Sequence, residues 1–224
     1  MPVQALIFDM DGTMVDSMPW HAQSWVTFTQ RHGLAIGVDE VMRRTTGLTG
    51  VECMRDLFQR DMDDAEARAL VEEKEVLYRE LYAPVFAEVA GFTSFTEQAR
   101  WRGLKMGVGT AGDRHNIAFV LSHLNLPSPP HAVVGGDEGL PGKPEPAIFL
   151  EAARRMNTPA QACIVFEDAP YGIEAARRAG MRAVAVCTSH TAAQLAGPHV
   201  LASVGNYLDL MNSNFLEKLH VATS

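Results

Sequence analysis

A short apolar segment near the N-terminus ends abruptly in two aspartates, and this feature constrains the fold more than any other. Residues 3–8 are typical of a buried strand, and the acids that follow it are Asp9 and Asp11. Aspartate is a poor strand residue, so two of them at a strand end need a reason. Because residues i and i+2 point to one side, both carboxylates can face one pocket, where a divalent cation would relieve their repulsion. The alternative is a plain strand followed by an Asp-Gly turn.

The chain beyond residue 88 alternates between apolar strand-like runs and helical patterns. Such alternation is typical of βαβ units, in which a parallel sheet is covered by helices on both faces. We therefore predict a three-layer, Rossmann-like α/β core, with ligands bound outside the carboxyl ends of the strands. Besides residues 3–8, the predicted strands are 106–108, Ala132–Val134, 164–166 and 183–186, and the predicted helices are 95–102, 116–124, 147–156, 172–178 and 215–221.

Residues 16–88 differ from the rest of the chain because they show helical patterns only. These patterns cover residues 20–31, Val38–Thr45, 50–60 and 65–81, the last of which Asp63 or Asp64 could cap. A helical block placed directly after the first strand predicts an inserted α-helical cap domain. The catalytic core would then comprise residues 1–15 and 89–224. The alternative is a helical elaboration without functional motion.

Composition excludes several classes of function. The chain has 224 residues, 47% of them hydrophobic and 21% charged, which is typical of a globular protein with room for a smaller inserted domain. Its net charge is −8 and no basic stripe is visible, so we expect no nucleic acid partner. Three cysteines at unrelated spacings indicate reduced thiols rather than disulfides.

The N-terminal segment lacks a basic region, and its apolar run is too short for a signal peptide or a membrane span. We therefore expect a cytoplasmic protein without a membrane partner. No obvious interface stripe stands out in the sequence, which is compatible with a monomer or a weak homo-oligomer.

Four motifs in a fixed order carry a resemblance to a known superfamily. They are Asp9-Met10-Asp11-Gly12-Thr13, the strand Lys105–Gly109 ending in Thr110, Gly142-Lys143-Pro144-Glu145-Pro146, and the strand that ends in Glu167-Asp168 before Ala169-Pro170-Tyr171-Gly172. Together they resemble the haloacid dehalogenase-like hydrolases over essentially the whole chain. Four ordered motifs are far more specific than any single one. The resemblance implies a Mg²⁺ cofactor and a small phosphorylated metabolite as substrate.

The resemblance gives the two aspartates of the first motif separate roles. Asp9 would be the nucleophile that forms an aspartyl-phosphate, although its residue type also fits a metal ligand alone. Asp11 would be the general acid and base, first protonating the leaving oxygen and then activating water. In the family the main-chain carbonyl at this position also binds the metal. The namesake dehalogenases and the phosphonate hydrolases generally lack this second aspartate, so Asp11 favours phosphate esters.

The second and third motifs supply candidate phosphate contacts. Thr110 offers a hydroxyl, and the small residues Ala111 and Gly112 let main-chain N–H groups approach a phosphate. A helix starting near Asp113 would add its positive end. Lys143, between a glycine and a proline, is placed by the resemblance against the transferring phosphoryl group. The alternatives are an ordinary strand cap at Thr110 and a solvated loop lysine.

The fourth motif supplies carboxylates of the type that binds hard cations. The resemblance favours Asp168 as a direct ligand, with Glu167 either direct or one step removed. The expected metal-binding set is therefore Asp9, Asp11, Glu167 and Asp168. Alternatively, Asp168 caps the helix that begins near Gly172.

Substrate selection is expected in the helical block, where His21, Gly47 and Lys74 are the candidates. The helix that carries His21 resembles that of β-phosphoglucomutases and related sugar phosphatases, although such residues also occur as plain surface positions. Those mutases hold a bisphosphate through an arginine in the cap loop. The matching loop here, Thr49-Gly50-Val51, has no arginine.

These features predict a Mg²⁺-dependent phosphatase of a small phosphorylated metabolite, most simply a sugar phosphate. A phosphosugar mutase is the second reading. It would need a bisphosphate activator and would give an isomerised product. A non-catalytic, metabolite-binding protein is the third. The third reading does not explain a nucleophile, an acid/base and a metal ligand together.

Overall fold

The structure, a computed structural model, describes residues 2–45 and 50–220. The chain divides into two compact units. One comprises Met1–Asp16 with Ala87–Ser224, and the other comprises Ser17–Phe86. We call them the sheet unit and the helical unit. Among the described residues, no helix combines the length and the apolarity needed to cross a membrane.

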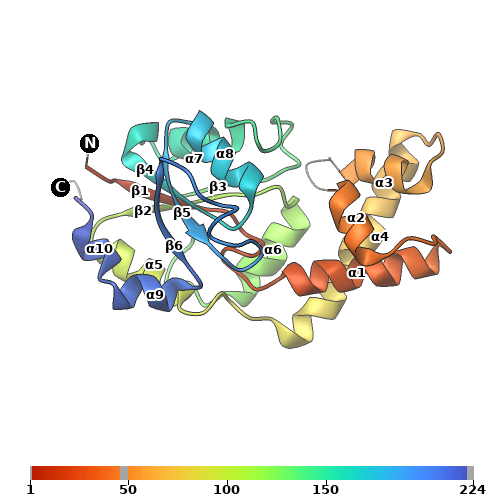
Figure 1. Ribbon diagram of the computed structural model, residues 1–224, viewed down its shortest axis with the longest axis horizontal. Helices are drawn as coiled ribbons and strands as arrows, with labels where there is room; N and C mark the ends of the chain where they lie inside the picture. Colours follow the sequence, from red (N-terminus) through yellow and green to blue (C-terminus); the bar gives the residue numbers. More distant parts are fainter. Residues whose placement is uncertain (1, 46–49, 221–224) are drawn as a thin grey trace. The chain divides into compact units, whose positions relative to one another are not determined.

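The sheet unit is built on six parallel strands in the order β3-β2-β1-β4-β5-β6 (Figure 1). They are β1 (Ala5–Phe8), β2 (Lys105–Gly109), β3 (Ala132–Val134), β4 (Cys163–Glu167), β5 (Arg182–Val186) and β6 (Val200–Val204). β1 lies between β2 and β4, and all four of its residues are buried. A strand covered on both faces needs an unbroken apolar run, which explains the sequence of β1.

Side chains that alternate along the strands form two separate cores. Ile7 belongs to the cluster that packs under α7 (Ala147–Arg155) and α8 (Pro170–Arg178). Phe8 instead stacks on Phe166, with ring centroids 4.6 Å apart, and contacts Phe92 edge-to-face at 5.2 Å. The second core therefore lies under α5 (Phe92–Trp101) and α9 (Tyr207–Asn212). Figure 1 shows these two helix pairs on opposite sides of the sheet. The predicted three-layer α/β fold is confirmed.

Two elements at the end of the chain were missed by sequence reasoning. The edge strand β6 has no prediction because only one of its faces is half-buried, so its apolar signal is weak. The six-residue helix α9 is too short to show a clear period. The predicted closing helix is α10 (Phe215–Lys218), which ends at Lys218, and residue 221 lies outside the described residues. The sheet unit also contains α6 (Arg114–His123) and the short 3₁₀ helix η2 (Ala160–Ala162).

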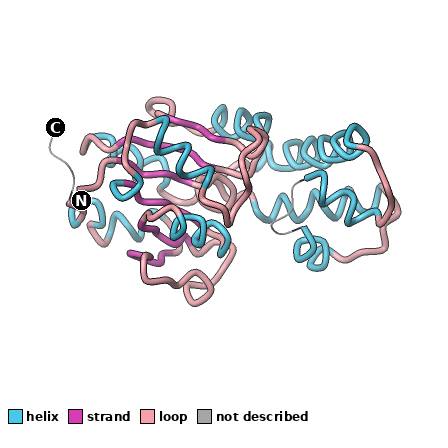
Figure 2. The backbone as a smooth tube through the Cα atoms, turned by 90° about the horizontal axis from the view of Figure 1, so that it is seen from above, coloured by secondary structure: helices cyan, strands magenta, loops and turns pink. Residues whose placement is uncertain are grey.

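The described part of the helical unit contains helices and loops alone (Figure 2). Its elements are α1 (Met18–Arg31), α2 (Val38–Thr45), α3 (Gly50–Phe58), α4 (Asp64–Tyr82) and the 3₁₀ helix η1 (Ala83–Val85). The unit has a core of its own, in which Trp25, Phe28, Met54, Leu57 and Leu77 are buried. A separate core accounts for the helical pattern of this segment, since each helix buries one face against the others.

We expect Asp63→Ala to weaken the helical unit. Asp63 is the N-cap of α4, and its carboxylate accepts a hydrogen bond of 2.8 Å from the Glu66 N–H. Losing such a cap typically costs about 1 kcal/mol. Urea unfolding followed by circular dichroism measures this loss. Asp61→Ala is the control, because Asp61 lies outside the helix, and an equal loss in both variants would contradict the prediction.

Candidate functional site

Three neighbouring strands bring their motifs to one edge of the sheet. β1 ends before Asp9, β2 before Thr110, and β4 at Glu167, and Phe8 pairs in register with residues of both flanking strands. In doubly wound sheets of this strand order, ligands bind outside the carboxyl ends where the order reverses. Here the reversal falls between β1 and β4, where Asp9 follows β1, Glu167 ends β4 and Asp168 comes directly after it.

The side chain of Lys143 joins two carboxylates at this edge. Its Nζ donates to Asp9 Oδ1 at 2.5 Å and to Glu167 Oε1 at 2.7 Å. All three side chains are at most 10% exposed. The Nζ also lies 4.9 Å from the centroid of the Phe149 ring, a cation–π distance. The structure thus brings together Asp9 and Lys143, which are far apart in the sequence.

Burial and charge shift the pKa values of this pair. Burial raises the pKa of Asp9 well above its usual value, and the Lys143 ammonium opposes that rise. Burial alone would lower the pKa of Lys143, but Asp9 and Glu167 together raise it above its usual value. Lys143 therefore keeps its proton, and it is the positive charge beside the candidate nucleophile.

Both carboxylate oxygens of Glu167 accept hydrogen bonds from protein groups. Its Oε1 accepts from Lys143, and its Oε2 accepts from the Ala169 N–H at 2.8 Å. A Cβ added at Gly172 would lie 1.7 Å from Oε1, so only glycine leaves room for this carboxylate. Glu167 therefore holds Lys143 in place, and its role as a metal ligand stays a prediction from the sequence.

Asp168 lies beside the turn that follows β1. It is 4% exposed, and its Oδ1 accepts from the Thr13 hydroxyl at 3.4 Å. Gly12 has a φ of +74°, and a Cβ there would lie 2.3 Å from Asp168 Oδ2. Burial, and then the charge of Glu167, raise the pKa of Asp168 to about 7. The helix-capping alternative for Asp168 is wrong, because the N-cap of α8 is Ala169 and no side chain caps that helix.

The loop after β2 holds the candidate phosphate contacts. Thr110 is buried, and its hydroxyl accepts from the Gly112 N–H at 3.0 Å. Ala111 is exposed. The carboxylate of Asp113 caps α6 by accepting from the N–H groups of His115 and Asn116, which agrees with the predicted start of this helix. Since Gly112 already donates to Thr110, a phosphate that takes this N–H must compete with the hydroxyl.

The metal donors suit a cation that keeps its water. Within residues 2–45 and 50–220, no group of three or more His, Cys, Asp or Glu side chains is arranged to hold a metal ion. The expected set of four carboxylates is therefore not assembled here as a metal cage. Mg²⁺ needs only one or two carboxylates, completed by waters and substrate oxygens. Asp9 and Asp168 lie close enough for their charges to interact, and a pair of carboxylates is enough to meet that requirement.

The helical-unit candidates His21 and Lys74 lie in contact. Lys74 Nζ is 2.9 Å from His21 Nδ1 and 2.9 Å from Glu75 Oε1, and the lysine is 3% exposed. The His21 ring stacks on Tyr78, with centroids 3.8 Å apart. Sequence reasoning named His21 and Lys74 as candidates but did not predict these contacts, which come from the packing of α1 on α4. The third candidate, Gly47, lies outside the described residues.

The loop after β5 is a part of the site that sequence reasoning missed. The Thr188 hydroxyl donates to the carbonyl of Gly12 at 2.5 Å, and His190 Nδ1 lies 2.9 Å from the carbonyl of Asp168, to which it donates. The loop therefore ties the turn after β1 to the end of β4. The rule that selects the carboxyl ends of parallel strands would have found it.

We expect Gly172→Ala to be destabilising, although alanine ordinarily favours a helix more than glycine does. The new methyl group would overlap Glu167 Oε1, and such overpacking costs about 1–3 kcal/mol. Chemical unfolding measures the loss of stability. Gly142→Ala is the matched control, because nothing lies within 4 Å of a Cβ at that position. Equal stability of the two variants would show that Glu167 adjusts freely.

Comparisons with known proteins agree with this geometry. Residues 3–180 match the family model of the haloacid dehalogenase-like hydrolases. The chain is 34% identical over 182 residues to a fructose-1-phosphate phosphatase of Escherichia coli, which covers 81% of this chain and 95% of that protein. It is 31% identical over 201 residues to a validoxylamine A 7′-phosphate phosphatase of Streptomyces hygroscopicus, with 87% and 91% covered.

The fold is also found in solved structures. A β-phosphoglucomutase from Clostridium difficile superposes with a TM-score of 0.81 at 24% identity, covering 96% of each chain. At that identity the likeness shows the fold alone. The family model covers most of the sheet unit and the helical unit, and the first relative is matched over nearly its whole length. The chain therefore belongs to the haloacid dehalogenase-like hydrolase family, as its four motifs indicated.

Proposed function

We propose that this hydrolase is a Mg²⁺-dependent phosphatase of a small phosphorylated sugar, and that it works through an aspartyl-phosphate on Asp9. The observation that carries the proposal is the contact between Asp9 and Lys143 at the reversal of the strand order. A phosphoric monoester hydrolase agrees with the family and with the phosphatase relatives. Because those relatives are named for fructose 1-phosphate and validoxylamine A 7′-phosphate, a small monophosphate is the substrate class they support.

In the first step an oxygen of Asp9 attacks phosphorus, and the bond to the leaving oxygen breaks. Lys143 orients the nucleophile through Oδ1 and balances charge that moves onto the phosphoryl oxygens. Asp11 gives its proton to the leaving alkoxide, which departs as an alcohol. The buried position of Lys143 strengthens its attraction to the charge on the phosphoryl oxygens, because charge interactions are larger away from water.

In the second step water attacks the phosphorus of the aspartyl-phosphate. Asp11 takes the proton of that water, and the bond between phosphorus and Asp9 breaks to release inorganic phosphate. Both residues return to their starting protonation states. One carboxyl group thus serves as acid and then as base.

The charge of the site supports a bound cation. Asp9, Glu167 and Asp168 place three carboxylates around one ammonium, and the pKa values of Asp9 and Asp168 are raised by burial. A bound Mg²⁺ would supply positive charge to Asp9, Asp168 and the substrate phosphate. The cap role of the helical unit, the cytoplasmic location and the weak or absent self-association stay predictions from the sequence.

We expect wild-type protein to release inorganic phosphate from sugar monophosphates with Mg²⁺ and not with EDTA. Asp9→Asn should lower this rate by about a thousandfold or more, because an amide is a poor nucleophile. Asp16→Asn is the control, since the same change is made at an exposed position. A phosphate assay across sugar and nucleotide monophosphates provides the measurement, and undiminished turnover by Asp9→Asn would refute the mechanism.

Analysis of the sugar phosphate products and a binding measurement separate the other readings. Conversion of β-glucose 1-phosphate to glucose 6-phosphate when bisphosphate is added, without phosphate release, would make the protein a mutase. Phosphorylated metabolite bound without turnover in any condition would make it a binding protein. The absence of arginine from Thr49-Gly50-Val51 favours hydrolysis over the mutase.

We also expect metal-free protein to lose stability as the pH rises from about 4 to about 7. Folded Asp168 holds its proton up to a pKa of about 7, whereas an unfolded aspartate loses it near 3.8. Over that interval the folded state binds more protons, so rising pH favours unfolding. In EDTA, the melting temperature should fall more between about pH 4 and about pH 7 in the wild type than in Asp168→Asn. At the higher pH, Mg²⁺ should restore the melting temperature of the wild type. Parallel pH profiles for both proteins would contradict this assignment.

A further inference from the structure

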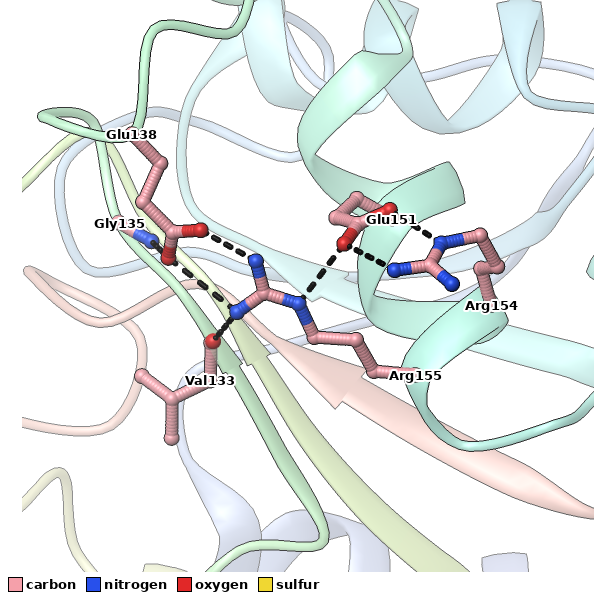
Figure 3. A network of polar contacts seen from close by, with 6 residues as sticks. All are labelled: Val133, Gly135, Glu138, Glu151, Arg154 and Arg155. Carbon is pink, nitrogen blue, oxygen red and sulfur yellow. Dashed lines mark hydrogen bonds and ion pairs between the residues drawn. The ribbon is translucent and has the colours of Figure 1, made fainter.

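Arg155, the last residue of α7, joins that helix to the strand and turn beside it (Figure 3). Its Nη1 donates to the Val133 carbonyl of β3 at 2.5 Å, and its two terminal nitrogens reach both oxygens of Glu138. Its Nε donates to Glu151 Oε1 at 2.8 Å. Glu138 Oε1 in turn accepts from the Gly135 N–H at 2.9 Å. One guanidinium thus holds the end of β3 and the turn of residues 135–138.

This turn lies directly against the loop of residues 110–112, which we call the phosphate loop. The Gly136 N–H donates to the Gly112 carbonyl at 2.9 Å. A Cβ on Gly136 would lie 2.1 Å from the Ala111 carbonyl oxygen, so the two backbones are in closest contact. The Thr110 N–H donates to the Val134 carbonyl at 3.0 Å, which links the same two segments once more. Any shift of the turn is therefore transmitted to the phosphate loop.

The segment that starts at this turn also carries the catalytic lysine. After residue 138 the chain continues to Lys143 and then enters α7, at whose far end Arg155 lies. The connection from β3 to α7 is thus anchored near both ends. At one end, Glu138 is fixed by Arg155, and at the other, Lys143 is fixed by Asp9 and Glu167.

We propose that Arg155 and Glu138 are positioning residues that hold the phosphate loop in its binding geometry by fixing the turn of residues 135–138 against it. This inference rests on the proposed phosphatase function, because it assigns the phosphate to this loop. Neither side chain belongs to the four motifs, and neither touches the reacting atoms.

An ordinary surface ion pair would not have this effect, since most contribute little. The Arg155 pair differs in its geometry. It is bidentate, and each side chain is about one-third exposed. Both partners also bind main-chain groups of the segment that they hold, the Val133 carbonyl and the Gly135 N–H. A side chain that binds main-chain groups fixes the path of the backbone itself.

The neighbouring residue Arg154 provides a matched control. It lies on the same helix and binds Glu151 through Nε at 2.7 Å and Nη2 at 2.8 Å, with 72% of its side chain exposed (Figure 3). Arg154→Ala therefore removes one arginine and one bidentate ion pair without touching β3 or the turn. The comparison of Arg155→Ala with Arg154→Ala isolates the contact to the turn.

The test measures hydrogen exchange of the full-length protein together with binding of inorganic phosphate by calorimetry in the presence of Mg²⁺. Arg155→Ala should raise the exchange of amides in residues 109–113 and 134–138. The same variant should weaken phosphate binding by about fivefold or more and raise KM for a monophosphate by a similar factor, because the loop must be ordered again at each binding event. The value of kcat should change less. Arg154→Ala should leave all of these at the wild-type value.

Three results would overturn the proposal. One is equal exchange in the two variants, and another is faster exchange in Arg155→Ala with unchanged phosphate affinity. If Arg155→Ala does not fold, Glu138→Gln answers the same question, because it keeps the shape of the side chain and removes its charge. The third result that would overturn the proposal is a Glu138→Gln variant that binds phosphate as tightly as the wild type. Wild-type protein without phosphatase activity would refute the proposed function, whereas the exchange comparison tests the positioning role separately.

Discussion

The buried contact between the Lys143 ammonium and the Asp9 carboxylate is the interaction on which the rest of the site depends. A carboxylate placed this deep would ordinarily take up a proton, and a protonated acid is a poor nucleophile. Lys143 opposes that protonation, and Glu167 fixes the lysine from the other side. The missing side chain at Gly172 is part of the same arrangement, because it makes the space that Glu167 occupies. The site is thus a small network of charges in which each member has a steric or electrostatic partner.

The sequence alone was enough for the three-layer architecture and for the candidate residues that follow the first strands of the sheet, for reasons that lie in particular residues. Buried strands such as β1 read as unbroken apolar runs, and the polar residues that follow them mark the edge where ligands bind. The edge strand β6 and the short helix α9 were not found, because a half-buried strand and a six-residue helix leave little pattern. Both lie after the last of the four motifs, so only the local pattern was there to indicate them.

The contacts between the candidate residues could not be predicted from their residue types. The acid pair Glu167-Asp168 has the chemistry of metal ligands at both positions, and nothing in the local sequence indicates that Lys143 engages one of them from a distant loop. The turn of residues 135–138 and its arginine were invisible for a related reason. Their importance comes from a backbone contact with Ala111 and Gly112 that only the packed sheet creates. Residue type predicts chemistry, whereas the choice of partner depends on distances that the sequence does not contain.

The central place of β1 has a consequence for the order in which the chain acquires structure during synthesis. β1 is made first, yet its hydrogen-bonding neighbours β2 and β4 begin only at Lys105 and Cys163. The helical unit, which lies between β1 and β2 in the sequence, has its own core and can fold while the ribosome is still translating the remaining strands. β1 therefore stays without its neighbours in the sheet while the helical unit is made, and Asp9 meets the ammonium of Lys143 only after that residue has emerged. The proposed site is thus completed late, together with the sheet.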